Sequence, residues 1–302
     1  MNGDRKNKEN NNSELKIGII GGDRRLCAFT EAATEDGFEC AVWGSAECRR
    51  GVRCRTVESA VQDSVAIILP LPVSQDGIRL FAPGSCEGTD LRLARLLEVI
   101  PRGARVFGGK IPCEFACTLR ERGITVTDYY ENEAFKIKNA YQTAEGAVGV
   151  AITELPVTVF GSKMLVIGYG RVGRSVARLL YRLGSHVTIA ARKESDLAHA
   201  YCEGFDTIDI SESFDGIDLE YDAVFNTVPA RILTGNALKR LEGCLLIELA
   251  SSPFGEDAEE ADAAGVKLIR AVSLPGKTSP VSAGISIYQT VRDILRKEGV
   301  IK

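Results

Sequence analysis

A glycine-rich turn between two apolar runs is the part of this sequence best suited to chemistry. From Lys163 to Arg192 the chain reads as an apolar run, then Gly168, Gly170 and Gly173 at GxGxxG spacing, then a helix-period stretch and a second apolar run. Strand, glycine turn, helix and strand in this order form the dinucleotide-binding unit. The glycines permit a tight turn, a close approach of backbone to a pyrophosphate, and close packing of helix on strand. The free N–H groups of the helix N-terminus suit phosphates, so the turn predicts a dinucleotide site. Its predicted cofactor-binding residues are Gly168, Tyr169, Gly170, Arg171, Val172 and Gly173.

The end of the second apolar run bears on which dinucleotide is bound. A site that prefers NAD usually places Asp or Glu there, about twenty residues past the glycines, to bond the ribose hydroxyls. This chain has Ala191, Arg192 and Lys193, with Ser195 close behind. Guanidinium and phosphate form charge-assisted bonds, so Arg192 and Lys193 suit a 2′-phosphate. The pattern favours NADP(H). The alternatives are binding of NAD, and a solvated basic turn that binds no phosphate.

Two further strand ends are expected near the cofactor, because ligands of such sheets gather at the carboxyl ends of the strands. Asn226, Thr227, Val228 and Pro229 follow one apolar run and are predicted to line the cofactor; a plain strand-to-turn transition is the alternative. The next run leads to Ala250, also expected at the cofactor. It then reaches two predicted substrate-binding hydroxyls, Ser251 and Ser252.

Several other polar residues form a predicted pocket for an anionic substrate. Lys277 is expected in a proline-flanked loop, where it would anchor a carboxylate. Thr143 and Glu145 lie on an expected connecting helix. Taken singly, each residue of this set is more typical of a surface or capping position than of a functional one, whereas as a set facing one crevice they would form the pocket. The predicted catalytic residues are Glu145, Lys277 and Thr143, and the further substrate-binding residues are Arg24, Ser74, Lys110, Thr278 and Ser279.

The positions of the histidines and cysteines argue against two kinds of active site, that of a 2-hydroxy-acid dehydrogenase and a metal centre. A 2-hydroxy-acid dehydrogenase needs a histidine acid/base near the hydride-transfer centre, but His186 starts a strand and His199 follows the adenosine-side turn. The nine cysteines are scattered, without a CxxC pair or a histidine at zinc spacing. We therefore predict no metal site and expect reduced thiols that act as small apolar residues.

Composition indicates an ordinary globular protein. The chain has 302 residues, 45% of them hydrophobic and 26% charged, with a formal net charge of -4. This mildly acidic balance, without a basic stripe, argues against a nucleic-acid partner. No apolar run reaches the roughly 18 residues of a membrane span. Residues 1–14 read as a disordered polar tail without the apolar segment of a signal peptide, so we expect a cytoplasmic protein.

Strands alternate with helices along the whole chain. The expected strands are 15–20, 38–43, 65–69, 105–107, 125–128, 164–167, 187–190, 223–226, 245–249 and 267–270, with helices at 26–36, 91–98 and 114–122 between the early ones. This alternation predicts an α/β fold: two Rossmann-like, doubly wound parallel-sheet domains with an interdomain cleft. The predicted parts are a tail (1–14), a substrate-side domain (15–131), a linker helix (132–156), an NAD(P)-binding domain (157–281) and a C-terminal helix (282–302) that returns to the hinge.

The motifs together resemble the A subunits of bacterial dipicolinate synthases. The likeness rests on NAYQTAEGAVGVAI, GSKMLVIGYGRVGRSVA, NTVPARIL, LIELASSPFG and LPGKTSPVSAG, and on the opening IGIIGGDRR and the LPLPVS turn. It covers nearly the whole chain. GxGxxG is generic, but TAEG, the LAS strand end and LPGKxxP in combination are far more specific.

The resemblance implies a reaction and a partner. The reaction is an NAD(P)-linked oxidation of a dihydrodipicolinate-type intermediate of the lysine pathway to pyridine-2,6-dicarboxylate. The implied partners are the small dicarboxylate substrate and a flavoprotein-like B subunit, in the cytoplasm of the mother cell of a sporulating bacterium. Assembly into a homo-oligomer stays open, as do two other functions: an amino- or imino-acid dehydrogenase of the alanine-dehydrogenase type, and a noncatalytic dinucleotide-binding subunit.

Overall fold

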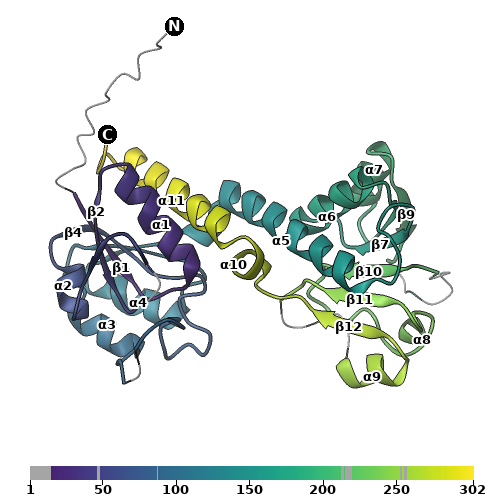
Figure 1. Cartoon of the computed structure of the whole chain (residues 1–302), viewed down its shortest axis with the longest axis horizontal. Coiled ribbons are helices and arrows are strands. Elements are labelled where there is room, and N and C mark those ends of the chain that lie inside the picture. Colours follow the sequence, from purple (N-terminus) through teal and green to yellow (C-terminus); the bar gives the residue numbers. More distant parts are fainter. Residues whose placement is uncertain are drawn as a thin grey trace, which may run out of the picture. The chain divides into compact units, whose positions relative to one another are not determined.

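The computed structural model of the protein describes residues 15–45, 48–86, 88–211, 214, 220–251, 254 and 257–302. The chain divides into two compact units (Figure 1). The first unit comprises the described parts of Met1–Lys136 together with Ser279–Lys302, and the second comprises those of Ile137–Thr278. Each unit is α/β, which confirms the predicted fold class. The predicted tail lies outside the described residues.

The first unit contains a six-stranded sheet whose neighbouring strands pair in parallel, in the order β3-β2-β1-β4-β5-β6. Its strands are β1 (Lys16–Ile20), β2 (Glu39–Trp43), β3 (Val52–Arg53), β4 (Ser64–Ile68), β5 (Arg105–Gly108) and β6 (Thr125–Asp128). Its helices are α1 (Arg24–Glu35), α2 (Val57–Val61), α3 (Leu93–Val99), α4 (Cys113–Glu121), the 3-10 turn η1 (Tyr129–Glu131) and α11 (Pro280–Lys297).

The second unit repeats this topology, with the order β12-β11-β10-β7-β8-β9, again with parallel neighbours. Its strands are β7 (Lys163–Ile167), β8 (His186–Ala191), β9 (Asp206–Asp209), β10 (Ala223–Asn226), β11 (Leu245–Glu248) and β12 (Lys267–Arg270). The helices in this part of the chain are α5 (Glu133–Glu154), α6 (Arg171–Arg182), α7 (Glu194–Cys202), α8 (Gly235–Lys239), α9 (Ala258–Ala263) and α10 (Leu274–Thr278). The division between the units falls inside α5.

Both sheets are buried on their two faces because their central strands are continuous apolar runs. In β7, Met164 and Val166 face α5 and α6, whereas Leu165 and Ile167 face α8 and α9. This alternation is the period of two along a strand, and burial of both faces is typical of parallel sheets. In each unit the strand order reverses between two central strands, β1 and β4 in the first and β7 and β10 in the second. Ligands of such sheets bind at this reversal, beyond the carboxyl ends of the strands.

Helix α11 completes the core of the first unit although it lies far from α1 in the sequence. Figure 1 shows the two helices side by side, and Ile287 and Val291 join the core cluster of Leu26 and Phe29. The helices touch at Gly284, where a Cβ would lie 2.1 Å from the carbonyl oxygen of Arg25. The expected helix at the end of the chain is therefore present.

Helix α5 carries small residues toward the sheet of the second unit. Ala144, Ala147 and Ala151 are buried in the same cluster as Met164 and Val166. Small side chains let helix and sheet approach closely. The helix ends at Glu154, shortly before Pro156, which cannot continue a helical hydrogen-bond ladder.

The structure also differs from the sequence-based expectations at the level of elements. The segment around Lys277 is the short helix α10 rather than a loop. Pro275 is compatible with this helix because it sits in the first turn, where the backbone N–H would have no helical partner. Strand β9 reads DTID and lies at the sheet edge, so it lacks the apolar pattern by which the other strands were predicted.

Candidate functional site

A cavity of about 360 Å³ lies in the second unit at the carboxyl ends of β7, β8 and β10. Most of the residues predicted to bind the cofactor line it: Gly168, Tyr169, Gly170, Arg171, Val172, Arg192, Lys193, Thr227, Val228 and Pro229. Ala190, Ala191, Asp196, Ile210 and Ile232 complete the lining. The cavity thus lies at the reversal of strand order, where the glycine turn after β7 meets the turn after β10.

The three glycines of the turn stand in different surroundings. Gly168 has a φ of +91°, and a Cβ there would lie 2.6 Å from Thr227 Oγ1. A Cβ on Gly173 would lie 2.1 Å from the carbonyl oxygen of Gly168, so only glycine lets α6 approach the turn. At Gly170, by contrast, a Cβ would meet nothing within 4 Å. This glycine leaves open space beside the backbone, which is what a closely approaching pyrophosphate requires.

The N-terminus of α6 has no side chain to cap it. Gly170 is its N-cap residue, so the N–H groups of the first turn receive no side-chain hydrogen bond from that position. Arg174 holds the turn from behind: its Nε donates to the carbonyl oxygen of Tyr169 at 3.1 Å, and its guanidinium lies 4.8 Å from the Tyr169 ring centroid. Burial, together with the nearby carboxylate of Glu203, raises the pKa of Tyr169 and keeps the phenol neutral. The turn therefore presents backbone N–H donors in fixed positions, to which an anion can bind.

The end of the cavity next to β8 carries two cationic side chains. Strand β8 ends in two alanines, and Arg192 and Lys193 follow with exposed side chains. Asp196 also lines the cavity, and its carboxylate lies 3.9 Å from the guanidinium of Arg174. No carboxylate occupies the end of β8, where a site that prefers NAD usually has one.

A buried polar pair supports the turn after β10. Asn226 and Glu248 are partners in the parallel register of β10 and β11, and both are fully buried. The Asn226 amide donates to Glu248 Oε2 at 2.6 Å and to the carbonyl oxygen of Val228 at 3.2 Å, and Asn226 Oδ1 accepts from the Val228 N–H at 3.1 Å. The predicted cofactor residue Asn226 thus shapes the turn from beneath, while Thr227 and Val228 face the cavity.

Glu248 is a residue that the sequence analysis missed. Its Oε1 accepts from the Ala250 N–H at 2.7 Å, so one carboxylate ties the turns after β10 and β11 together. Ala250, predicted at the cofactor, is buried in this arrangement and does not line the cavity. Of the two predicted substrate-binding serines, Ser251 is exposed and Ser252 lies outside the described residues.

The predicted catalytic residues of the second unit lie on two helices in contact. A Cβ on Gly146 of α5 would lie 2.9 Å from Thr278 Oγ1 of α10, so the helices meet there. Glu145 and Lys277 are exposed neighbours of this contact. The Thr143 hydroxyl donates to the carbonyl oxygen of Asn139 at 2.8 Å, and that of Thr278 to the carbonyl oxygen of Leu274 at 2.9 Å. Both hydroxyl groups thus already donate within their own helices, and their oxygens remain acceptors.

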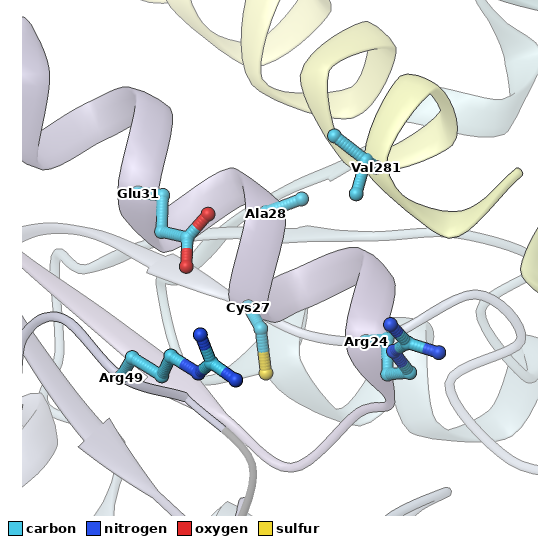
Figure 2. A pocket seen from close by; sticks show the side chains of 6 residues that line it. All are labelled: Arg24, Cys27, Ala28, Glu31, Arg49 and Val281. Carbon is cyan, nitrogen blue, oxygen red and sulfur yellow. The ribbon is translucent and has the colours of Figure 1, made fainter.

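In the first unit, Arg24 and Arg25 have different environments. Arg25 is buried; its guanidinium pairs with Asp23 at 2.8 Å and donates to the carbonyl oxygen of Leu71, which fixes the start of α1 against the turn after β4. Arg24 is exposed and lines a cavity of about 570 Å³ beside α1 (Figure 2). Of the two arginines, only Arg24 has a guanidinium that can meet a ligand.

The remaining predicted residues of the first unit follow other elements. The Ser74 hydroxyl donates to Asp76 at 2.9 Å; the backbone N–H groups of Arg79 and Ile78 lower the pKa of this carboxyl to about 2. Lys110 follows β5, with its ammonium 5.0 Å from the centroid of the Tyr130 ring. Ser279 is the N-cap residue of α11, and among the described residues its hydroxyl has no hydrogen-bond partner.

Within the described ranges, no three or more His, Cys, Asp and Glu side chains gather in a way that could hold a metal ion. Among the described helices, none combines the length and apolarity needed to cross a membrane.

Comparisons with known proteins agree with the motif resemblance. Residues 16–130 match the model of the N-terminal domain of the dipicolinate synthase A subunit. The dipicolinate synthase A subunit of Bacillus subtilis strain 168 is 29% identical over 291 residues, which are 94% of this chain and 95% of the relative. The resemblance drawn from the motifs is thereby confirmed.

Solved structures show the same relation. The dipicolinate synthase A subunit from Bacillus halodurans superposes with a TM-score of 0.83 at 27% identity, and the match covers 93% of this chain and 97% of that one. An L-alanine dehydrogenase shares the fold, with a TM-score of 0.62 at 13% identity and coverage of 95% and 91%.

Proposed function

Because residues 16–130 belong to the family of the N-terminal domain of dipicolinate synthase A subunits and nearly the whole chain resembles those proteins, we propose that the protein is a nicotinamide-dinucleotide oxidoreductase of dipicolinate formation. The proposed reaction removes a hydride and a proton from a dihydrodipicolinate-type intermediate of the lysine pathway and yields pyridine-2,6-dicarboxylate. The product ring is aromatic, so the oxidation is downhill. The protein then needs chiefly to position the reactants and to accept a proton.

The observation that carries this proposal is the cavity at the strand-order reversal of the second unit. The open space at Gly170 and the first turn of α6 suit the pyrophosphate, and Ile210 and Ile232 offer apolar walls to an adenine ring. Arg192 and Lys193 suit a 2′-phosphate, which favours NADP over NAD. Bound there, the dinucleotide would supply the hydride acceptor.

The substrate residues are proposed by chemical type. A dicarboxylate needs cationic anchors, and Arg24, Lys110 and Lys277 have accessible side chains of that charge. Hydroxyl groups would complete the carboxylate contacts, and we assign this role to Ser74, Ser251, Ser252, Thr278 and Ser279. Glu145 is the proposed proton acceptor, with Thr143 on the same helix. In this assignment residues 15–131 form the substrate side and residues 157–281 the cofactor side.

The family resemblance also supports a proposed partner and setting. The Bacillus relatives are named as A subunits, which implies a second kind of subunit in their assembly. We propose that the partner of this chain is a flavoprotein-like B subunit. The proposed location is the cytoplasm of the mother cell of a sporulating bacterium.

The test is coupled synthesis of the lysine-pathway intermediate with NADP⁺ or NAD⁺, with this chain alone and with the B subunit. Reduced nicotinamide and dipicolinate should appear together, each followed by its ultraviolet absorbance.

Arg192→Ser should weaken the use of NADP⁺ about tenfold or more and spare that of NAD⁺, because one charge-assisted phosphate contact contributes roughly 1.5–3 kcal/mol. Arg182→Ser, an exposed arginine on α6 away from the cavity lining, is the matched control.

Other outcomes would assign the chain differently. Dinucleotide binding without turnover, together with equal dipicolinate output when this chain is omitted, would contradict the oxidoreductase proposal and favour a noncatalytic subunit. Dinucleotide reduction with amino acids, and none with the lysine-pathway intermediate, would favour a dehydrogenase of the alanine-dehydrogenase type.

A further inference from the structure

Two cysteine side chains meet in the first unit, outside the machinery described above. Cys27 lies on α1 and Cys48 beyond β2, and their sulfur atoms are 2.6 Å apart and share a hydrogen bond. Both residues are buried, at 8% and 3% exposure. The hydroxyl of Ser45 lies 3.5 Å from the Cys48 sulfur and 3.7 Å from the Cys27 sulfur. The pair is reduced, yet its sulfurs need to approach by only about half an ångström to reach the ~2.05 Å of a disulfide.

One member of the pair is accessible to small molecules. Cys27 lines the cavity of about 570 Å³ that also contains Arg24 and Arg49. Figure 2 shows the Cys27 sulfur pointing away from α1, beside the guanidinium of Arg49. A cysteine beside a cation, in a partly open cavity, has the surroundings typical of reactive thiols. The cavity thus offers a route by which a small reagent reaches Cys27 but not the more deeply placed Cys48.

The electrostatics distinguish this pair from the other buried cysteines. The hydrogen bond with Cys27 outweighs burial and lowers the pKa of Cys48, assisted by Ser45. Burial instead raises the pKa of Cys40 to about 11 and that of Cys244 to about 12. Because the thiolate is the nucleophile in exchange reactions, reactivity is concentrated in the pair.

We propose that Cys27 and Cys48 form a redox-active thiol pair, a modification site for low-molecular-weight disulfides. The Cys27 thiol loses its proton as its sulfur attacks the small disulfide through the cavity; a mixed disulfide forms, and the thiolate that leaves takes up that proton. The Cys48 thiolate then attacks the Cys27 sulfur, forms the internal disulfide and expels the second thiolate, which takes up a proton. Two protein thiols are oxidised and one small disulfide is reduced to two thiols, and an excess of a small thiol reverses the exchange.

The test uses the full chain with its exposed cysteines replaced: Cys86→Ser, Cys113→Ser, Cys117→Ser and Cys202→Ser. This protein is incubated with oxidised glutathione, quenched in acid, denatured, alkylated and analysed by peptide mass spectrometry. The expected result is a loss of two alkylatable thiols and one cross-linked pair of peptides containing Cys27 and Cys48, both reversed by reduced glutathione. Survival of both thiols, or a bond that joins other cysteines, would overturn the proposal.

Single variants separate the two roles. With Cys48→Ser, a glutathione mixed disulfide should accumulate on Cys27, because the resolving thiol is gone. With Cys27→Ser, no internal bond should form and glutathione should not add to Cys48. The control is Cys40→Ser, a buried cysteine of the same core cluster, which should leave the Cys27–Cys48 bond unchanged. Glutathionylation of Cys48 in place of Cys27 would contradict the proposed order of attack.

Discussion

Individual glycines of the second unit differ in what an added side chain would meet. Substitutions at different glycines can therefore test ligand binding and fold stability separately. Gly170 borders the cavity of about 360 Å³ in the second unit, with open space around its missing Cβ, whereas Gly173 is closed against the carbonyl of Gly168. Gly149 on α5 is exposed and equally open. A methyl group can therefore be added at Gly170 or Gly149 without a clash in the protein itself.

Gly170→Ala should retain the fold and weaken dinucleotide binding about tenfold or more, roughly 1.4 kcal/mol, because the methyl group occupies the space proposed for the pyrophosphate. Calorimetric titration with NADP⁺ and thermal unfolding measure the two properties. Gly149→Ala should keep wild-type affinity and gain about 0.5–1 kcal/mol of stability, as expected for alanine in an exposed helix. Unchanged NADP⁺ affinity in Gly170→Ala would argue against the proposed pyrophosphate position.

Glu248→Gln should destabilise the second unit by about 1–3 kcal/mol. The carboxylate accepts from both Asn226 and the Ala250 N–H, and a glutamine amide can offer an acceptor to only one of them. Urea denaturation measures the loss. Glu242→Gln, at an exposed position after α8, is the control and should unfold like the wild type.

Residues could be grouped from the sequence where the signal is local. The GxGxxG turn occupies six consecutive positions, and five of them, Gly168 to Val172, line one cavity in the structure. Asn226 and Glu248 meet only through the register of two strands that are 22 residues apart, which a single sequence does not display. The available signal was that each is a polar residue ending a buried apolar run. Cys27 and Cys48 were likewise treated as separate apolar residues, because no local spacing brings them together.

At the scale of elements, the contact of α1 with α11 stabilises the first unit. Gly284→Ala should destabilise it by about 1–3 kcal/mol, because the added Cβ would lie 2.1 Å from the Arg25 carbonyl and must force the helices apart. Differential scanning calorimetry would detect the change. The opposite sign is expected for Gly149→Ala, and equal effects of the two variants would show that the contact is looser than described.

The same pair of helices carries a pH-dependent interaction. Burial opposes ionisation of Asp36, but the hydrogen bond from Tyr288 at 2.5 Å and the Arg292 guanidinium at 3.1 Å outweigh it and lower its pKa. A carboxyl with a lowered pKa contributes stability above its unfolded value, near 3.9, and loses it as pH falls through the folded value.

Tyr288→Phe should therefore cost about 1 kcal/mol near pH 7, and the difference from wild type should shrink as the pH falls below the unfolded value and Asp36 takes up a proton in the folded state. Urea midpoints near neutral pH and below that unfolded value measure this. Tyr201→Phe, an exposed tyrosine in the second unit, is the control. A difference that grows on acidification would contradict the assigned ionisation.

Elements were predictable in proportion to their apolar pattern. The central strands are uninterrupted apolar runs, and each was expected from the sequence. The short edge strand β3 is exposed, β9 is mostly polar, and α10 contains Pro275 and Gly276. In these cases pairing and packing, rather than local preference, decide the conformation.

At the scale of the whole molecule, two copies of one topology are built from a single chain. Both sheets have the order 3-2-1-4-5-6 when their strands are numbered along the chain. The alternation of strands and helices predicted parallel doubly wound sheets. That α11 belongs to the same compact unit as α1 follows from tertiary packing and not from sequence proximity.

Truncation after Thr278 should therefore unfold the first unit and spare the second. Removal of α11 exposes the apolar face formed by Leu26, Phe29 and Ile17. Calorimetry should show one of two unfolding transitions lost, and dinucleotide binding should persist. Retention of both transitions would mean that the first unit is stable without α11.

The placement of α11 has a consequence for biosynthesis. A ribosome makes β1 to β6 first, then the whole second unit, and only afterwards the helix that covers α1. The second unit can fold as soon as it emerges, whereas the first must wait for more than 140 residues with part of its apolar surface uncovered. Nascent chains stalled before α11 should accordingly recruit chaperones through the segment made earliest, and should release them when translation of α11 is complete.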